Sequence, residues 1–68
     1  MKTFRMADVD RIEAALTEGK TVTIEWHTPY EKGTKVETVK SVRWDGLVFT
    51  TGGCVFTGID KLVALTVA

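Results

Sequence analysis

The heptapeptide Thr-Val-Thr-Ile-Glu-Trp-His, residues 21–27, decides the fold class because apolar and polar side chains alternate along it without interruption. Val22, Ile24 and Trp26 fall on one face of an extended chain, and the polar residues fall on the other. This period of two predicts a strand with one buried face. We therefore expect Trp26 in the core, and Pro29 ends the strand.

Upstream of this strand, residues 8–18 are predicted to form a helix. Its apolar residues recur at spacings that gather on one face: Val9, Ile12, Ala15 and Leu16. Asp8 or Asp10 is the expected N-cap, and Asp10 with Glu13 has the spacing of a capping box. Gly19 stands where a helix commonly ends in a left-handed residue.

Downstream, every signal is a short strand or a turn. The expected strands are residues 34–44, 47–51, 54–57 and 62–67, separated by turns at 45–46, 52–53 and 58–61. Val39 and Val42 are three residues apart and would face opposite ways on a regular strand, so a bulge or bend is expected near Lys40 and Ser41. The prediction is a mostly β fold, in which an N-terminal helix precedes a strongly bent five-stranded antiparallel small barrel.

The chain is expected to be a single domain over residues 1–68, with the barrel over 21–67, because neither half could bury enough apolar surface alone. The predicted core combines both element types: Ile12, Leu16, Val22, Ile24, Phe49, Val55 and Leu65.

Composition excludes several classes of protein. Nine Lys and Arg balance nine Asp and Glu, so we expect no non-specific DNA binding. No stretch approaches the roughly 20 apolar residues of a membrane span. One cysteine, Cys54, and one histidine, His27, provide neither an intrachain disulfide nor a structural zinc site. With no export signal apparent, the expected compartment is the cytoplasm.

No residues are spaced as catalytic groups, and the prediction is therefore a protein without enzymatic activity, metal or cofactor. Cys54 begins an apolar strand and is expected to be a buried, inert thiol. His27 has no acid or nucleophile beside it and is expected to be an uninvolved histidine at a loop edge. The glycines at 52, 53 and 58 precede strands rather than a helix, so they form no phosphate-binding loop.

The order of elements resembles the Sm-like family, which comprises the Lsm and Hfq-type proteins. The resemblance covers roughly residues 8–67. It is carried by a helix leading into residues 21–25, by the pair Trp44-Asp45 at the turn after the long second strand, and by Val-Phe-Thr-Gly at 55–58 followed by Leu62. Thr57 stands where the family's second signature has arginine, and the Met-Asn of the first signature does not follow Asp45.

The resemblance implies an SH3-like small barrel that assembles into rings by pairing the fourth strand of one protomer with the fifth of the next. It also implies binding of single-stranded RNA, with Trp44, Asp45, Thr57 and Lys61 as candidate contacts. Trp44 is equally compatible with core packing. Tyr30 is added because a loop aromatic can stack on a base, although such residues also cover the edge of a core. The turn at 58–61 is either an ordinary surface turn or, in a ring, part of the pore.

Self-association is also expected from the residues themselves. The last strand is apolar on both faces and, after Lys61, carries neither charge nor proline to prevent edge pairing. The candidate interface residues are Val55, Leu62, Val63 and Leu65. A second reading remains open, in which the chain is a small protein-binding or inhibitory module that docks on a larger complex. Balanced charge and the missing RNA signatures favour this alternative, whereas the order of elements favours the first.

Overall fold

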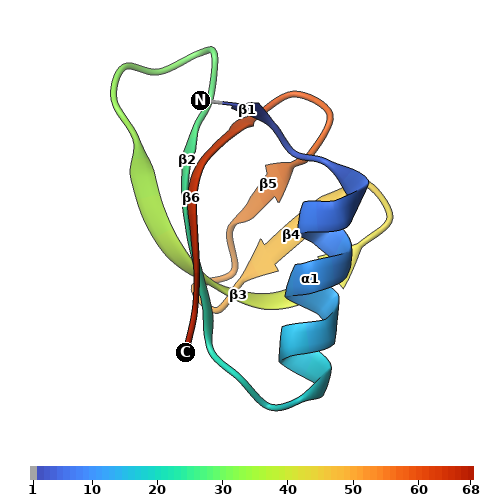
Figure 1. The fold of residues 1–68 in the computed structure, drawn as a ribbon. Helices are drawn as coiled ribbons and strands as arrows, with labels where there is room; N and C mark the ends of the chain where they lie inside the picture. The colour runs from blue at the N-terminus through green and yellow to red at the C-terminus, as the bar shows by residue number, and fades with distance from the viewer. Residues whose placement is uncertain (1) are drawn as a thin grey trace.

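The computed structural model describes residues 2–68, with the side chains of residues 4–68, as one helix and a bent antiparallel sheet (Figure 1). In chain order the elements are β1 (Lys2–Thr3), α1 (Met6–Thr17), β2 (Val22–His27), β3 (Lys35–Arg43), β4 (Gly46–Phe49), β5 (Cys54–Phe56) and β6 (Lys61–Val67). The strand order across the sheet is β1-β6-β2-β3-β4-β5. The mostly β fold with one N-terminal helix is therefore confirmed.

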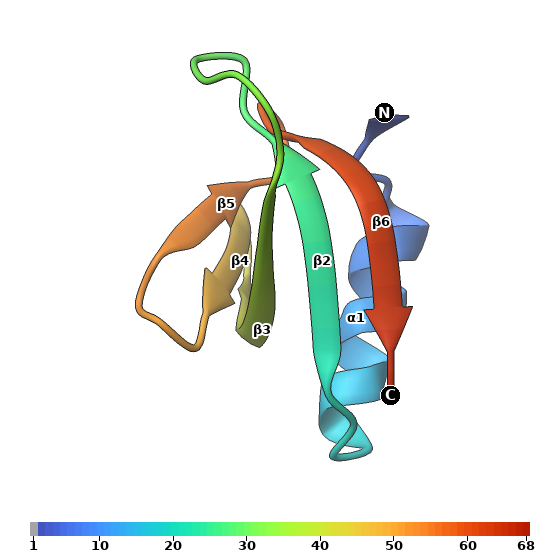
Figure 2. The ribbon, with the colours of Figure 1, turned by 90° about the vertical axis from the view of Figure 1, so that its left-hand side faces the viewer.

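A bulge divides the sheet into two halves. Residues 35–38 of β3 pair with β2, whereas residues 39–43 pair with β4, and the register shifts between Val39 and Ser41. The predicted bulge at Lys40 is thus confirmed. It turns the second half of β3 away from β2, so that β2 and β6 lie on one side of the molecule and β4 and β5 on the other (Figure 2).

The expected small barrel does not form, because the sheet remains open. Among residues 2–68, β5 pairs with β4 alone, and the opposite edge of the sheet is β1. β5 has only three residues, and β1 already pairs with Lys61 and Leu62 of β6. The short strand β1, which the sequence did not predict, therefore extends the sheet at the edge that a closing strand would use.

Helix α1 starts two residues earlier than predicted. Arg5 is its N-cap, with an extended backbone (φ −98°, ψ 157°), and its N–H donates to Oδ2 of Asp8 at 3.0 Å. Asp8 therefore caps from the third helical position instead of serving as the N-cap, and Asp10 and Glu13 lie within the helix. A carboxylate in this first turn is stabilised by the free N–H groups around it.

The C-terminal end of α1 follows the prediction. Gly19 adopts a positive φ of 77°. Its N–H bonds to the carbonyl of Leu16 at 3.0 Å, and the N–H of Lys20 bonds to the carbonyl of Ala15 at 2.9 Å. This pair of bonds is the Schellman arrangement, which glycine favours because it has no Cβ to strain the left-handed backbone.

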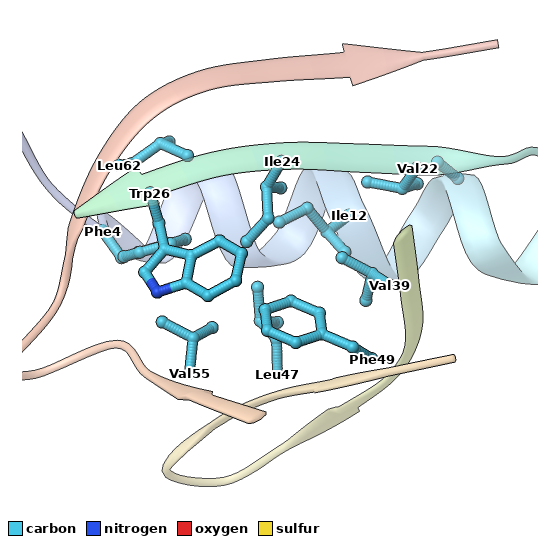
Figure 3. Close-up of a cluster of buried hydrophobic side chains, with 11 residues drawn as sticks. Phe4, Ile12, Val22, Ile24, Trp26, Val39, Leu47, Phe49, Val55 and Leu62 are labelled. Atoms are coloured by element: carbon cyan, nitrogen blue, oxygen red, sulfur yellow. The ribbon is translucent and has the colours of Figure 1, made fainter. Parts of the chain in front are cut away.

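The core lies between α1 and the two halves of the sheet (Figure 3). Five of the seven predicted core residues are buried: Ile12, Val22, Ile24, Phe49 and Val55. Leu16 and Leu65 are only partly buried and pack against the cluster. Trp26 is in the core as expected, with its ring 4.7 Å from that of Phe49.

Residues that the sequence did not assign to the core complete it: Phe4, Ala15, Val39, Leu47 and Leu62. The expectation for Cys54 is wrong, because its side chain is exposed and Val55 next to it takes the inward position of β5. The alternation of the three-residue strand leaves only one side chain for the core.

Candidate functional site

Trp44 stands at the turn between β3 and β4 and is 95% exposed, which decides against core packing for this residue. A groove of about 530 Å³ runs from this turn to the first turns of α1. We call it the α1–turn groove; its lining residues are Phe4, Arg5, Met6, Val9, Asp10, Glu13, Val42, Arg43, Trp44, Thr57 and Gly58. An indole that projects into solvent beside a groove is available to stack on a ligand.

The β3–β4 turn and the β5–β6 connection meet at this groove. The N–H of Thr57 donates to the carbonyl oxygen of Asp45 at 3.2 Å, and its hydroxyl lies 3.4 Å from the same oxygen. The structure therefore brings together Asp45 and Thr57, which are candidates from different parts of the sequence, next to Trp44.

Arg43 is a member of this cluster that the sequence did not single out. Its Nε and Nη2 atoms lie 3.2 and 3.1 Å from Oδ1 of Asp45, so this carboxylate oxygen accepts two hydrogen bonds from the guanidinium. The guanidinium is thereby held beside Trp44, although half of the side chain remains exposed. The opposite charges of Arg43 and Asp45 on the two sides of Trp44 are the signal that could have indicated it, because a turn brings its flanking residues close together.

The charges along the α1–turn groove are balanced. Arg5 and Arg43 contribute positive charge, while Asp10 and Glu13 on α1 contribute negative charge. The groove therefore has no strong field of one sign, and any attraction of a polyanion depends on Arg5 and Arg43.

The two remaining RNA candidates lie elsewhere. Lys61 begins β6, half-buried, and pairs in register with Thr3 and with His27. Tyr30 lies in the loop between β2 and β3 and is 84% exposed. The five candidates thus separate into one cluster of three, Trp44, Asp45 and Thr57, and two residues outside it.

The loop that carries Tyr30 borders a second cavity of about 340 Å³, which we call the loop pocket. It is lined by Trp26, Thr28, Tyr30, Lys35, Cys54, Phe56, Ile59 and Asp60. At the end of β2, the Nδ1–H of His27 donates to the carbonyl oxygen of Gly33 at 2.6 Å and so holds the base of the loop. His27 therefore has a structural contact at a loop edge.

The four interface candidates differ in their placement. Val55 and Leu62 are 1% and 2% exposed, so their side chains contribute to the chain's own core and offer nothing to a neighbour. Val63 is 39% exposed and Leu65 is half-buried. Because β1 pairs only with Lys61 and Leu62, the outer edge of β6 is unpaired from residue 63 onward within the described chain.

No protein-family model, curated protein or solved structure matches this chain. Across residues 2–68 no helix has the length and apolar character needed to cross a membrane. The same part of the chain contains no cluster of three side chains suited to hold a metal ion.

Proposed function

We propose that the chain is a non-enzymatic Sm-like module that self-assembles and binds single-stranded RNA at the end of the α1–turn groove. The observation that carries the proposal is the hydrogen bond of 3.2 Å between Thr57 and Asp45, which joins the two turns beside the exposed indole of Trp44. The Sm resemblance draws its RNA contacts from these same two turns.

Each residue of the cluster has a distinct role in this proposal. Trp44 stacks on an unpaired base, an interaction that tolerates any base because every base has a π face. Arg43 contacts the neighbouring phosphate, because its side chain is half exposed despite the ion pair with Asp45. Asp45 positions Arg43 through its carboxylate and Thr57 through its carbonyl oxygen.

Self-assembly uses the two sheet edges. The three residues of β5 have no strand on their outer side, and the unpaired part of β6 is long enough to receive them. Pairing β5 of one protomer with β6 of the next is head-to-tail, so it repeats until a ring closes. Several Trp44 sites on one assembly would then bind one RNA strand with increased avidity.

A specific observation favours a second candidate, a module that docks on a protein partner. The α1–turn groove balances Arg5 and Arg43 against Asp10 and Glu13. Its lining also includes Met6, which is 74% exposed, and Trp44. Aromatic, Met and Arg side chains with little net charge are typical of the centres of protein interfaces.

A titration of a labelled oligouridylate, followed by fluorescence anisotropy at two salt concentrations, tests the RNA proposal. Trp44→Ala should weaken binding at least about fivefold, because loss of one stacked base costs about 1–3 kcal/mol. Tyr30→Ala is the matched control, since Tyr30 is similarly exposed but lies on the loop pocket. Failure of the unmodified protein to bind RNA would reject RNA as the ligand and leave the protein-binding candidate. Equal effects of both variants would reject the end of the α1–turn groove as the RNA site.

A further inference from the structure

The loop pocket is rich in aromatic side chains. Trp26 comes from β2, Tyr30 from the loop that follows it, and Phe56 from the end of β5. The β2–β3 loop and the β5–β6 connection lie at the same end of the molecule in both ribbon views (Figures 1 and 2). Phe56 is 43% exposed and Tyr30 is 84% exposed, so a ligand in the pocket can reach both rings.

Asp60 adds a buried negative charge to this aromatic pocket. Its side chain is 6% exposed, and Oδ2 accepts the N–H of Phe56 at 2.9 Å. Oδ1 forms no hydrogen bond, and the carboxylate no ion pair, with any side chain of residues 4–68. A carboxylate so far removed from water gains more from an opposite charge than one at the surface.

Among the described residues that line the loop pocket, Lys35 alone is basic, and it is paired with an acidic residue. Nζ of Lys35 lies 2.6 Å from Oε2 of Glu31. Glu31 precedes Lys35 by four residues and does not line the pocket. The side chains of Lys35 and Glu31 are 54% and 52% exposed, so water screens this ion pair, whereas Asp60 is 6% exposed and supplies the buried charge of the pocket. The electrostatics therefore favour a cation and disfavour an anion.

We propose that the loop pocket binds a quaternary ammonium group. Aromatic faces attract such a cation through their quadrupoles, and Asp60 supplies the compensating charge. The side-chain oxygens of the lining are those of Thr28, Tyr30 and Asp60, and three of its eight residues are aromatic, which suits an alkylated ammonium better than a primary ammonium with three N–H donors. The cavity of about 340 Å³ is at the small end of ligand pockets, as a compact head group requires.

This site is separate from the α1–turn groove, since the two cavities share no lining residue. The inference therefore stands whether or not the chain binds RNA. A quaternary ammonium group occurs both in small molecules such as choline and on trimethylated lysine side chains of proteins. Both sources carry the same chemistry, and the experiment distinguishes them.

The test uses Trp44→Phe protein, in which Trp26 is the sole tryptophan and reports on the pocket. Its fluorescence is followed during titration with choline, with the uncharged isostere whose tert-butyl group replaces the trimethylammonium, and with a short peptide carrying trimethyl-lysine. Choline should saturate the signal, and the isostere should bind at least about tenfold more weakly. Tighter binding of the peptide than of choline would identify a protein as the source, and the reverse would identify a small molecule.

Two matched substitutions separate chemistry from folding. Tyr30→Phe keeps an aromatic face and should retain choline affinity, whereas Tyr30→Leu should lower it several-fold. Asp60→Asn keeps an oxygen for the N–H of Phe56 but removes the charge, and it should weaken choline about tenfold while the fold is retained. Equal binding of choline and its isostere, or no binding of choline or the peptide at millimolar concentration, would overturn the proposal.

Discussion

The backbone N–H of Thr57 donates to the carbonyl oxygen of Asp45 at 3.2 Å, which joins the β3–β4 turn to the β5–β6 connection. Next to this bond, Arg43 is paired with the carboxylate of Asp45 and Trp44 is exposed to solvent. The exposed indole and the guanidinium are thus presented from a supported turn, which lowers the entropic cost of ordering them around a ligand.

Gly46 is predicted to be indispensable for this arrangement. A Cβ added to it would lie 1.9 Å from the carbonyl oxygen of Val55 and 3.2 Å from Cα of Phe56, both backbone atoms of the paired strand β5. Gly46→Ala must therefore separate β4 from β5, and we expect loss of cooperative folding in a denaturant titration. Gly58→Ala is the control, because nothing lies within 4 Å of its added Cβ. Equal stability of the two variants would contradict the close contact between Gly46 and the backbone of β5.

Ile24→Ala should destabilise the protein by about 2–5 kcal/mol, as expected for removing a large buried aliphatic side chain. Ile24 is 1% exposed and lies between α1 and the second half of the sheet (Figure 3). Val36→Ala on the neighbouring strand β3 should change stability by less than about 0.5 kcal/mol, because Val36 is 60% exposed. Thermal unfolding of both variants tests which face of each strand is buried. An unchanged melting temperature for Ile24→Ala would contradict the burial of Ile24.

Val63→Asp should dissociate the proposed assembly without unfolding the chain. Val63 is 39% exposed at the start of the unpaired edge of β6, and a carboxylate there would be buried against the neighbour's β5. Val36→Asp places the same charge at an exposed position of β3, outside the two strands β5 and β6 that the assembly would join, and should leave the assembly intact. Sedimentation at micromolar concentration measures both variants. A monomeric unmodified protein would reject edge-to-edge assembly.

Arg43→Gln should lower RNA affinity and also weaken its dependence on salt. Removing one phosphate contact to a single strand decreases the slope of log affinity against log salt by about 0.7. Lys40→Gln removes another exposed positive charge, at the β3 bulge and outside the α1–turn groove, and should leave the slope unchanged. Identical slopes for the two variants would remove Arg43 from the proposed site.

Several features of the fold follow directly from local sequence patterns. The alternation of residues 22–27 places Val22, Ile24 and Trp26 in the core, and the spacing of Val39 and Val42 locates the bulge that bends β3. Gly19 ends the helix as predicted. In each case the backbone geometry depends on neighbouring residues alone, so a short window of sequence contains the information.

Other features depend on contacts that no local pattern encodes. Arg5 is an unusual N-cap, and α1 begins after it because Asp8 satisfies its N–H. β1 pairs with β6 across nearly the whole length of the chain. The exposure of Trp44 and Cys54 depends on which residue of a turn or short strand faces the core, and Val55 occupies that place in β5. The contact between Asp45 and Thr57 likewise requires the tertiary fold.

Ultraviolet crosslinking of the protein to an oligouridylate, followed by mass-spectrometric mapping of the modified peptide, tests the central claim most directly. Crosslinking requires a base in contact with a side chain, and Trp44 is the aromatic residue exposed at the α1–turn groove. We predict modification of Trp44, with loss of the crosslink in Trp44→Ala and its retention in Tyr30→Phe. A crosslink confined to Tyr30 or to other residues of the loop pocket, or no crosslink at all, would contradict single-stranded RNA binding at this site.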